Sequence, residues 1–218
     1  MRISILGTGN VGDTIGSKLV ELGHDVMMGS RSANNEKALA FVAKQSGKAS
    51  AGTFADAAAF GEIIFNCTKG EASLDALKLA GAALDGKILI DVANPLDFSR
   101  GMPPGLVPAL SNFNSLGEEI QRTFPNVKVV KTLNTMWCGL MVNPRMIGDG
   151  NHINYLCGND AEAKEKVRAL LKTFGWKDEQ LLDLGDITNA RGTEAVLPIW
   201  LRVWGATKTG AFNFGIVR

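Results

Sequence analysis

The chain has 218 residues, of which 45% are hydrophobic, and its 23 lysines and arginines almost balance 22 aspartates and glutamates. This length supports one large domain, or one domain with an appendage, around a substantial core. A net charge near zero argues against the broad basic surface that binding to nucleic acid or to anionic membranes requires.

Apolar runs alternate with segments of helical period through the first 135 residues. The runs predict short strands rich in isoleucine and valine at 2–6, 25–28, 63–67, 87–92 and 128–132. The helical segments carry apolar residues at three- and four-residue spacing and predict helices at 11–22, 35–45 and 72–84. We therefore expect an α/β fold of the Rossmann type, with a doubly wound, mostly parallel sheet.

The texture changes after Thr135. Residues 136–151 form an irregular, glycine-rich stretch interrupted by Pro144. Beyond it the pattern predicts a strand at 152–157, a helix at 161–174 and a strand at 180–184, which is a further βαβ-like unit. We expect a Rossmann domain at 1–135 and a small C-terminal α/β lobe at 136–218.

A long apolar helix around 189–208, interrupted by Pro198, is the last predicted element. It is apolar around most of its circumference, with Trp200, Leu201 and Trp204 among its residues. Such a helix needs burial on more than one side. An exposed patch of that size would be unusual on a monomer, so we expect a homodimer.

The cysteines and the first residues indicate the compartment. Cys67, Cys138 and Cys157 are widely spaced and match neither a disulfide framework nor a zinc-ligand pattern. The N-terminus has no apolar stretch long enough for a signal peptide or a membrane span. We expect a cytoplasmic protein without a metal site and without a membrane partner.

A glycine loop, Gly7-Thr8-Gly9-Asn10-Val11-Gly12, follows the first predicted strand and opens the first predicted helix. This is the context of the G-x-G-x-x-G dinucleotide fingerprint. In that fingerprint Gly7 allows the tight turn, Gly9 lets the backbone approach a pyrophosphate, and Gly12 lets the helix pack close to the strand. Unpaired N–H groups at the helix start then face the phosphate charge. A merely structural connection is the alternative, but the register favours a dinucleotide site.

The tip of the second strand distinguishes NAD from NADP. An aspartate or glutamate there would bond the ribose 2′-hydroxyl and repel a 2′-phosphate. The tip reads Gly29-Ser30-Arg31 and has no carboxylate. Arg31 can form a forked contact with a phosphate, and Ser30 and Thr8 can donate from their hydroxyls. We therefore expect NADP, although a solvated surface arginine is the alternative for Arg31.

The residues that follow the other strands are the next candidates, because ligands of open parallel sheets lie beyond the carboxyl ends of the strands. They are Thr68-Lys69, Ala93-Asn94 and Asn134-Thr135. Lys69 either donates a proton or contacts a loop or a cofactor phosphate. Asn94 either positions the cofactor or starts a turn with Pro95.

No pair of nucleophile and base is visible, and neither His24 nor His152 lies in a catalytic or metal-binding motif. We therefore predict no catalytic side chain. Aromatic and sulfur side chains in apolar segments are candidates for the floor under a flat heterocycle, although such tryptophans usually belong to a core or an interface. These candidates are Trp137, Cys138, Trp200 and Trp204.

The glycine loop, the Gly29-Ser30-Arg31 tip and the tail segment Gly185-Asp186-Ile187-Thr188-Asn189-Ala190-Arg191 together resemble the deazaflavin (coenzyme F420)-dependent NADP oxidoreductase family. The segments at 157–160 and 197–198 are also similar to the N-terminal reductase domain of the six-transmembrane ferric reductases. The resemblance implies a homodimer that exchanges a hydride between NADPH and a small redox cofactor, a deazaflavin or flavin lying over the nicotinamide.

The resemblance also implies roles for matching residues. Thr8, Ser30 and Arg31 would hold the 2′-phosphate, and the glycine loop with Asn10 and Val11 would hold the pyrophosphate. The segment 133–136, which includes Asn134, Thr135 and Met136, would lie beside the nicotinamide and the second ring system, and Trp137 and Cys138 are further substrate candidates.

Some positions depart from the family pattern. Asn134 and Met136 stand where archaeal members typically have histidine and isoleucine, and Asn35 stands where they have a phosphate-binding lysine. Lys37, two residues further on, is a candidate to replace that charge. These departures leave the second substrate open.

Hydride transfer between two ring systems depends on orientation more than on a side-chain acid, which suits a sequence without a visible catalytic pair. We expect an NADP(H)-dependent oxidoreductase with a deazaflavin or flavin-like acceptor. One alternative is an NADP-dependent dehydrogenase or reductase of a small carbonyl or imine substrate, with Lys69 or an unrecognised group as the acid. The other is a non-catalytic NADP(H)-binding redox sensor.

Overall fold

Eight strands form one sheet in the order β10-β9-β8-β5-β4-β1-β2-β3 in the computed structural model, which describes residues 1–45 and 47–217. Neighbouring strands run parallel except β8 and β9, which pair antiparallel. The strands are β1 Arg2–Leu6, β2 Asp25–Ser30, β3 Ala49–Thr53, β4 Ile63–Asn66, β5 Ile88–Asp91, β8 Lys128–Thr132, β9 Asn154–Cys157 and β10 Leu181–Asp183. A separate short hairpin pairs β6, Leu96–Asp97, with β7, Gly105–Leu106.

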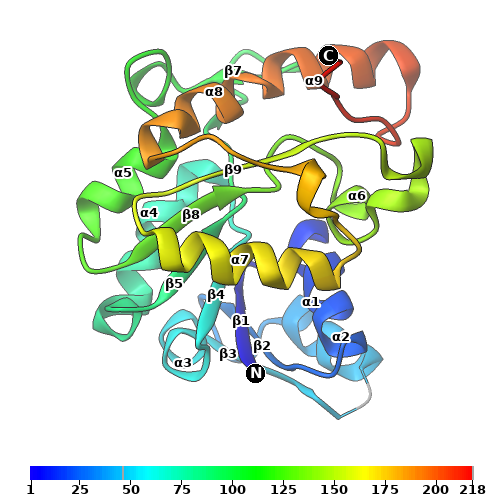
Figure 1. The fold of residues 1–218 in the computed structure, drawn as a ribbon. Helices are drawn as coiled ribbons and strands as arrows, with labels where there is room; N and C mark the ends of the chain where they lie inside the picture. Colours follow the sequence, from blue (N-terminus) through cyan, green and yellow to red (C-terminus); the bar gives the residue numbers. More distant parts are fainter. Residues whose placement is uncertain (46, 218) are drawn as a thin grey trace.

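Helices cover both faces of this sheet (Figure 1). The core on one face includes residues of α1 Asn10–Glu21, α2 Glu36–Lys44, α6 Cys138–Val142 and α7 Ala161–Thr173. The core on the other face includes residues of α3 Phe54–Phe60, α4 Gly70–Ala80, α5 Leu116–Thr123 and α8 Ala190–Ala195. Because both faces are buried, the central strands β1, β4 and β5 are mostly apolar. The expected doubly wound, mostly parallel α/β fold is confirmed.

The predicted elements of the first 135 residues are present, with ends that shift by a few residues. The helix expected at 72–84 is α4, which ends at Ala80 because Gly81 adopts a positive φ of 67°, and a 3₁₀ turn at Gly81–Leu84 follows. The strand expected at 128–132 has these same bounds in β8.

Several elements escaped the sequence patterns, among them β3, α3 and α5. β3 consists of small residues, Ala-Ser-Ala-Gly-Thr, which show no alternation of apolar and polar side chains. α3 begins directly after it at a capping box in which Thr53 and Asp56 satisfy each other's backbone N–H groups. α5 is only eight residues long and begins where the Ser115 hydroxyl accepts from the Glu118 N–H.

The sheet continues across the expected domain boundary at 135/136. β9 pairs with β8, and β10 pairs with β9 in parallel, so the predicted unit of strand, helix and strand is built onto the edge of the same sheet. The irregular stretch before β9 reverses the chain, which explains why β9 runs antiparallel to β8. The division into two domains remains a prediction.

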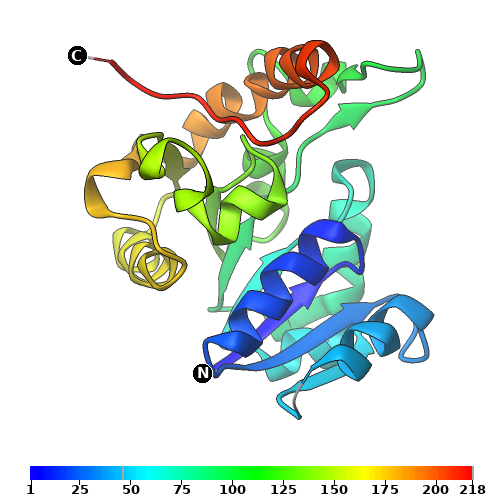
Figure 2. The same ribbon diagram turned by 90° about the vertical axis from the view of Figure 1, so that its right-hand side faces the viewer.

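The predicted terminal helix is two helices, α8 and α9 Leu197–Thr207, with a break at Val196. Pro198 lies in the first turn of α9, where a missing N–H costs nothing. Figure 2 shows α9 and the tail after it at the end of the molecule opposite the N-terminus. Ile199 and Trp204 of α9 are 51% and 40% exposed, so this chain alone does not supply burial on several sides. No helix among residues 1–45 and 47–217 is long and apolar enough to cross a membrane.

Candidate functional site

The glycine loop connects β1 to α1, and two of its glycines are required by contacts within the protein. Gly7 has a positive φ of 119°, and a Cβ atom on it would lie 2.6 Å from the Cys67 carbonyl oxygen. A Cβ atom on Gly12 would lie 2.3 Å from the Gly7 carbonyl oxygen. Both spacings are below any real contact, so neither position accepts a side chain without movement of the backbone.

Gly9 is different, because a Cβ atom on it would meet nothing within 4 Å. Its φ of −83° is available to every residue, so neither packing nor backbone conformation in the protein explains a glycine here. Gly9 is also the N-cap of α1, and no side chain caps that helix. The space in front of the α1 N-terminus is thus open, as close approach of a phosphate group to the backbone requires.

A cavity of about 600 Å³ lies beside this loop at the carboxyl edge of the sheet. It gathers residues from the ends of β1, β2 and β4 and from the starts of α2 and α4. Seven predicted cofactor residues line it together: Gly7, Thr8, Gly9, Ser30, Arg31, Thr68 and Lys69. The topology therefore brings the predicted pyrophosphate and 2′-phosphate residues to one cavity.

The end of this cavity at β2 is basic. Arg31 is exposed and lines the cavity together with Lys37, which lies in the first turn of α2. Asn35, also in the lining, is the N-cap of α2, and its side chain accepts from the Lys37 and Ala38 N–H groups. The Ser30 hydroxyl donates to the Ser32 carbonyl oxygen at 2.6 Å. Ser30 therefore shapes the turn that presents Arg31, and a bond from Ser30 to a phosphate would require exchange of this contact.

A second cavity, of about 310 Å³, continues along the same edge toward β5. Its walls include the predicted residues Val11, Thr68, Lys69, Ala93 and Asn94. Thr68 and Lys69 line both cavities, so the two hollows adjoin at the end of β4. Together they form one path from the tip of β2 to the turn after β5.

Asn94 and Asn134 join the ends of β5 and β8 through paired amides. The Asn94 Nδ2 donates to the Asn134 carbonyl oxygen at 2.8 Å, and the Asn134 Nδ2 donates to the Asn94 Oδ1 at 2.9 Å. Asn94 also starts a tight turn, since its carbonyl oxygen accepts from the Leu96 N–H. Both sequence interpretations of Asn94, as a turn former and as a positioning residue, are therefore compatible with its contacts.

Two buried polar atoms at the end of β8 have no hydrogen-bond partner within the described residues. They are the Oδ1 of Asn134 and the Oγ1 of Thr135, on side chains that are 2% and 1% exposed. Leu133 before them has a positive φ of 61°, and its N–H donates to the Asn154 side chain. A buried acceptor without a donor is costly, and a ligand amide is one group that would satisfy it.

The other predicted residues, Asn134 and Thr135 among them, lie outside the lining of the two cavities, as far as the described residues show. Met136 and Cys138 are buried, and Cys138 accepts from the Thr14 hydroxyl of α1 at 3.6 Å. Trp137 is 40% exposed and packs against two positions that have no side chain, Gly139 and Gly210. Asn10 is exposed at the start of α1, and Gly12 is buried beneath it.

The thiols and histidines supply no reactive pair at this edge within the described residues. Burial raises the pKa of the Cys67 thiol far above its usual range, with a smaller contribution from the nearby Asp91 charge, and burial raises the pKa of Cys157 to about 12. His24 lies before β2, at the opposite edge of the sheet. The ring of His152 contacts the Pro144 carbonyl oxygen and the Asn213 side chain.

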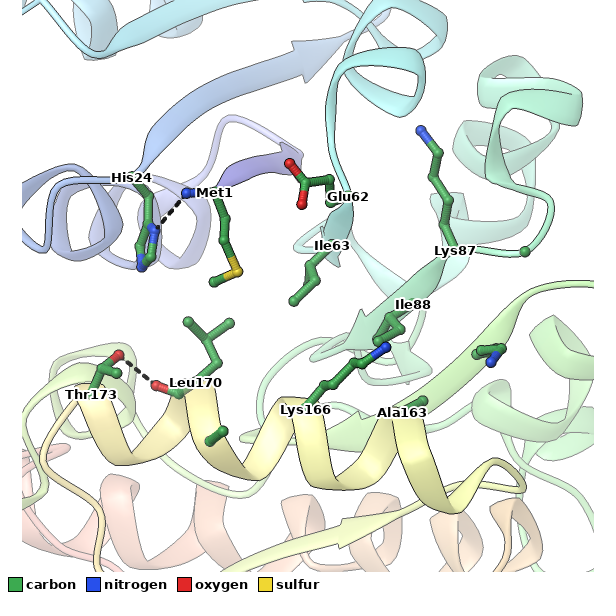
Figure 3. A pocket seen from close by; sticks show the side chains of 13 residues that line it. Met1, His24, Glu62, Ile63, Lys87, Ile88, Ala163, Lys166, Leu170 and Thr173 are labelled. Atoms are coloured by element: carbon green, nitrogen blue, oxygen red, sulfur yellow. Dashed lines mark hydrogen bonds between the residues drawn. The ribbon is translucent and has the colours of Figure 1, made fainter.

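Another hollow, of about 580 Å³, lies at the amino edge of the sheet beneath α7 (Figure 3). Its apolar walls include Ile63 and Ile88 from the sheet and Leu170 from α7. None of the predicted site residues lines it. Since open parallel sheets bind ligands at their carboxyl edge, this hollow is separate from the candidate site.

The sequence interpretation missed a cluster of buried charges behind the candidate site. Lys131 in β8 is 0% exposed and lies 2.8 Å from both Asp91 in β5 and Glu194 in α8. The available signal was an aspartate that ends the apolar strand Ile88–Asp91 and a lysine after the two valines of Lys128–Thr132. Charged residues are almost never fully buried unless they are paired.

Comparison with known proteins identifies the family of this chain. A family model described as NADP oxidoreductase, coenzyme F420-dependent, matches residues 2–95. A crystal structure from Arthrobacter sp. FB24, named a "putative F420 dependent NADP-reductase", is 50% identical, matches over 100% of both chains and has a TM-score of 0.93. The chain belongs to the coenzyme F420-dependent NADP oxidoreductase family. It is therefore a member of an NADP(H)-binding oxidoreductase family.

More distant matches extend this comparison. Metalloreductase STEAP3 of Rattus norvegicus is 32% identical over 206 residues, which is 91% of this chain. The chain spans 38% of that relative's length. The structure of an imine reductase from Myxococcus stipitatus in complex with NADP+ has a TM-score of 0.64 at 17% identity. The match covers 95% of this chain and 63% of the imine reductase chain. That last likeness shows the shared fold alone.

Proposed function

We propose that this family member transfers a hydride between NADP(H), bound along the carboxyl edge of the sheet, and a deazaflavin or flavin-like acceptor. The observation that carries the proposal is the path of two adjoining cavities, basic at the β2 end and lined at the β5 end by the uncharged residues Val92, Ala93, Asn94, Leu96 and Phe98. NADPH has this polarity, with a 2′-phosphate at one end and an uncharged nicotinamide ring at the other.

The residues of the path suit NADP(H) in three ways. The open space at Gly9 and the uncapped start of α1 suit a pyrophosphate. The guanidinium of Arg31 and the ammonium of Lys37 suit a 2′-phosphate, and Lys37 supplies the charge that Asn35 lacks. Asn134 lies behind the path, bonded to Asn94 of its lining, and its buried, unpartnered Oδ1 would suit the amide N–H of a nicotinamide carboxamide once a local movement exposes it.

Each part of the chain has a distinct task in the reaction. When bound, NADPH would supply a hydride from C4 of its nicotinamide ring, and the acceptor would take that hydride together with a proton from solvent. Arg31 and Lys37 anchor the phosphate end, while the α1 N-terminus holds the pyrophosphate. Asn94 and Asn134 fix the edge on which the ring lies, and their paired amides keep that edge rigid.

The absence of a positioned acid at the β5 end, among the described residues, favours a ring acceptor over a ketone or imine. Asn94, Asn134 and Thr135 do not donate a proton at neutral pH. Lys69 and Glu71, which line both cavities, are exposed, and Lys131 is already engaged by two carboxylates. Orientation of two stacked rings needs no such acid, whereas carbonyl reduction requires one.

The named relatives support a shared NADP(H)-oxidising half more than a shared acceptor. The Arthrobacter structure is named for F420 and metalloreductase STEAP3 is named for metals, although both match most of this chain. Trp137 offers a half-exposed indole at the end of β8 and is our candidate to contact the acceptor ring, with Met136 and Cys138 supporting it from the core.

We also propose that two copies of the chain assemble through α9. Ile199 and Trp204 leave an apolar surface on this helix that a second copy would cover.

The acceptor is tested by mixing the enzyme and NADPH with a deazaflavin, with flavins, and separately with small ketones and imines in a stopped-flow instrument. We expect oxidation of NADPH with the deazaflavin or a flavin only. NADPH deuterated at C4 should pass its label to the carbon that accepts the hydride in the deazaflavin. Turnover with ketones or imines would instead support the carbonyl or imine reductase, and NADPH binding without turnover of any acceptor would support the redox sensor.

A further inference from the structure

The buried ammonium of Lys131 has three oxygen partners and no contact with solvent. Its Nζ lies 2.8 Å from Asp91 Oδ2 and 2.8 Å from Glu194 Oε1, and it donates to the Ala93 carbonyl oxygen at 2.5 Å. All three N–H groups of the ammonium are thereby used. Lys131 therefore holds fixed the carbonyl of Ala93, the residue immediately before Asn94.

The Asp91 side of the cluster leads to the two cavities. Asp91 Oδ1 accepts from the Asn66 Nδ2 at 2.8 Å and from the Ala93 N–H at 3.2 Å. Asn66 in turn accepts from the Thr68 hydroxyl at 2.6 Å. Thr68 lines both cavities and Ala93 lines the second. The cluster thus reaches the candidate site from behind two of its strands.

The Glu194 side leads away from the site. Glu194 belongs to α8, and its two carboxylate oxygens accept from the N–H groups of Leu116 and Gly117 at 2.9 and 3.1 Å. These N–H groups open α5, where a negative charge is favoured by the helix dipole. One carboxylate therefore joins α8, α5 and the ammonium of β8.

The cluster holds two carboxylates against one ammonium, and all three side chains are buried. Burial by itself would lower the pKa of Lys131, but the attraction of Asp91 and Glu194 prevails and raises it. Burial raises the pKa of Glu194 by disfavouring its charged form, and the Asp91 charge adds to that shift, whereas Lys131 and the Leu116 N–H oppose it. Buried ion groups of this kind contribute little net stability compared with apolar side chains of similar size. Stability alone is thus a weak reason for this arrangement.

We propose that Glu194 and Lys131 are positioning residues for the nicotinamide half of the NADP(H) site. Glu194 of α8 pairs with Lys131, and Lys131 donates to the Ala93 carbonyl oxygen. The contact at Ala93 fixes the backbone next to Asn94, whose side chain accepts from Asn134. Arg31 and Lys37, which we assign to the adenine half of NADP(H), take no part in this series of contacts from Glu194 to Asn134. This inference rests on the proposed function only in its placement of the cofactor.

The test compares two ligands that differ in the nicotinamide half. Calorimetry measures binding of NADPH and of 2′,5′-ADP, which carries the adenine and the phosphate of the 2′ position but no nicotinamide. We expect Glu194→Gln to weaken NADPH binding by about tenfold, which corresponds to about 1.4 kcal/mol, and to leave 2′,5′-ADP binding unchanged. Glutamine keeps the size of the side chain but presents one N–H group to donors that need an acceptor.

Glu118→Gln is the matched control. Glu118 lies in α5 and pairs with Arg191 of α8, so it joins the same two helices without touching Lys131. It should change neither affinity. Glu194→Asp provides a second variant that retains the charge and shortens the side chain, and it should weaken NADPH binding selectively even if Glu194→Gln does not fold.

Equal losses for both ligands, or no loss in either Glu194 variant, would overturn the proposal. An equal loss of NADPH affinity in Glu118→Gln would also overturn it, because any weakening of the contact between α5 and α8 would then suffice. None of these measurements uses an acceptor. A wrong acceptor assignment would therefore leave the result intact, and a failed positioning role would leave the acceptor assignment intact.

Discussion

Gly9→Ala separates the demands of the ligand from those of the fold. The added methyl group meets no protein atom within 4 Å, and the φ of −83° suits alanine. Alanine loses less chain entropy on folding than glycine does, which favours the variant by about 0.4–1 kcal/mol. Alanine is a poorer N-cap than glycine by about the same amount. The two effects nearly cancel, so the free energy of unfolding should change by less than about 1 kcal/mol.

The same methyl group should damage binding strongly, because it occupies the space that we assign to the pyrophosphate. Hydrogen bonds from N–H groups to a charged ligand contribute about 1.5–3 kcal/mol each. Displacement of the phosphate from two such groups would cost at least about 2.8 kcal/mol, or about a hundredfold in affinity. Affinity for NADPH is measured by calorimetry, and stability by thermal unfolding without ligand.

The matched control is Gly12→Ala, whose methyl group would overlap the Gly7 carbonyl oxygen at 2.3 Å. This variant should lose about 1–3 kcal/mol of stability, which lowers the unfolding temperature of a chain of this size by about 2–12 °C. If Gly9→Ala binds NADPH within about threefold of the wild type, or unfolds as readily as Gly12→Ala, the open space at Gly9 is not the pyrophosphate site.

Further predictions concern specificity, pH and assembly. Arg31→Ala and Lys37→Ala should each weaken NADPH binding by about tenfold or more and NADH binding little, as measured by fluorescence titration; equal losses would mean that these cations do not contact the 2′-phosphate. Hydrogen bonds from Arg191 lower the pKa of Glu118, so this carboxylate stabilises the fold above its unfolded pKa and loses that effect as pH falls through the folded value. Glu118→Gln should therefore lower the unfolding temperature at neutral pH, and the difference should vanish in acid; a difference that persists in acid would exclude the ion pair as its cause. The wild type should sediment as a dimer and Trp204→Glu as a monomer at micromolar concentration, whereas a monomeric wild type would contradict assembly through α9.

The strands and helices that the sequence predicted in the first 135 residues were predictable because their signals are local. Apolar runs and helical periods follow from burial of one or both faces of an element, and they appear in the sequence near the residues that they describe. The glycine loop was predictable for the same reason, since Gly7 and Gly12 are required by contacts at its own turn. The position of Arg31 followed from the tip of β2, because the fingerprint places a phosphate there.

Elements without a periodic signal were missed. β3 is made of small residues that pack against β2 without alternation, and only its pairing in the sheet defines it as a strand. The break between α8 and α9 was foreseeable at Pro198, but the exposure of Ile199 and Trp204 was not, because the amount of surface that a helix buries depends on what packs against it.

The sequence by itself determined the class of fold and one end of the candidate site, because a turn of glycines and the tip of one strand are short-range features. Only the tertiary structure placed Lys37 on the cavity, paired Asn94 with Asn134 and buried Lys131 between Asp91 and Glu194. These contacts join segments that are far apart in the chain. A hydrogen bond between such segments leaves no pattern in either one, so it becomes visible only when the sheet has brought their ends together.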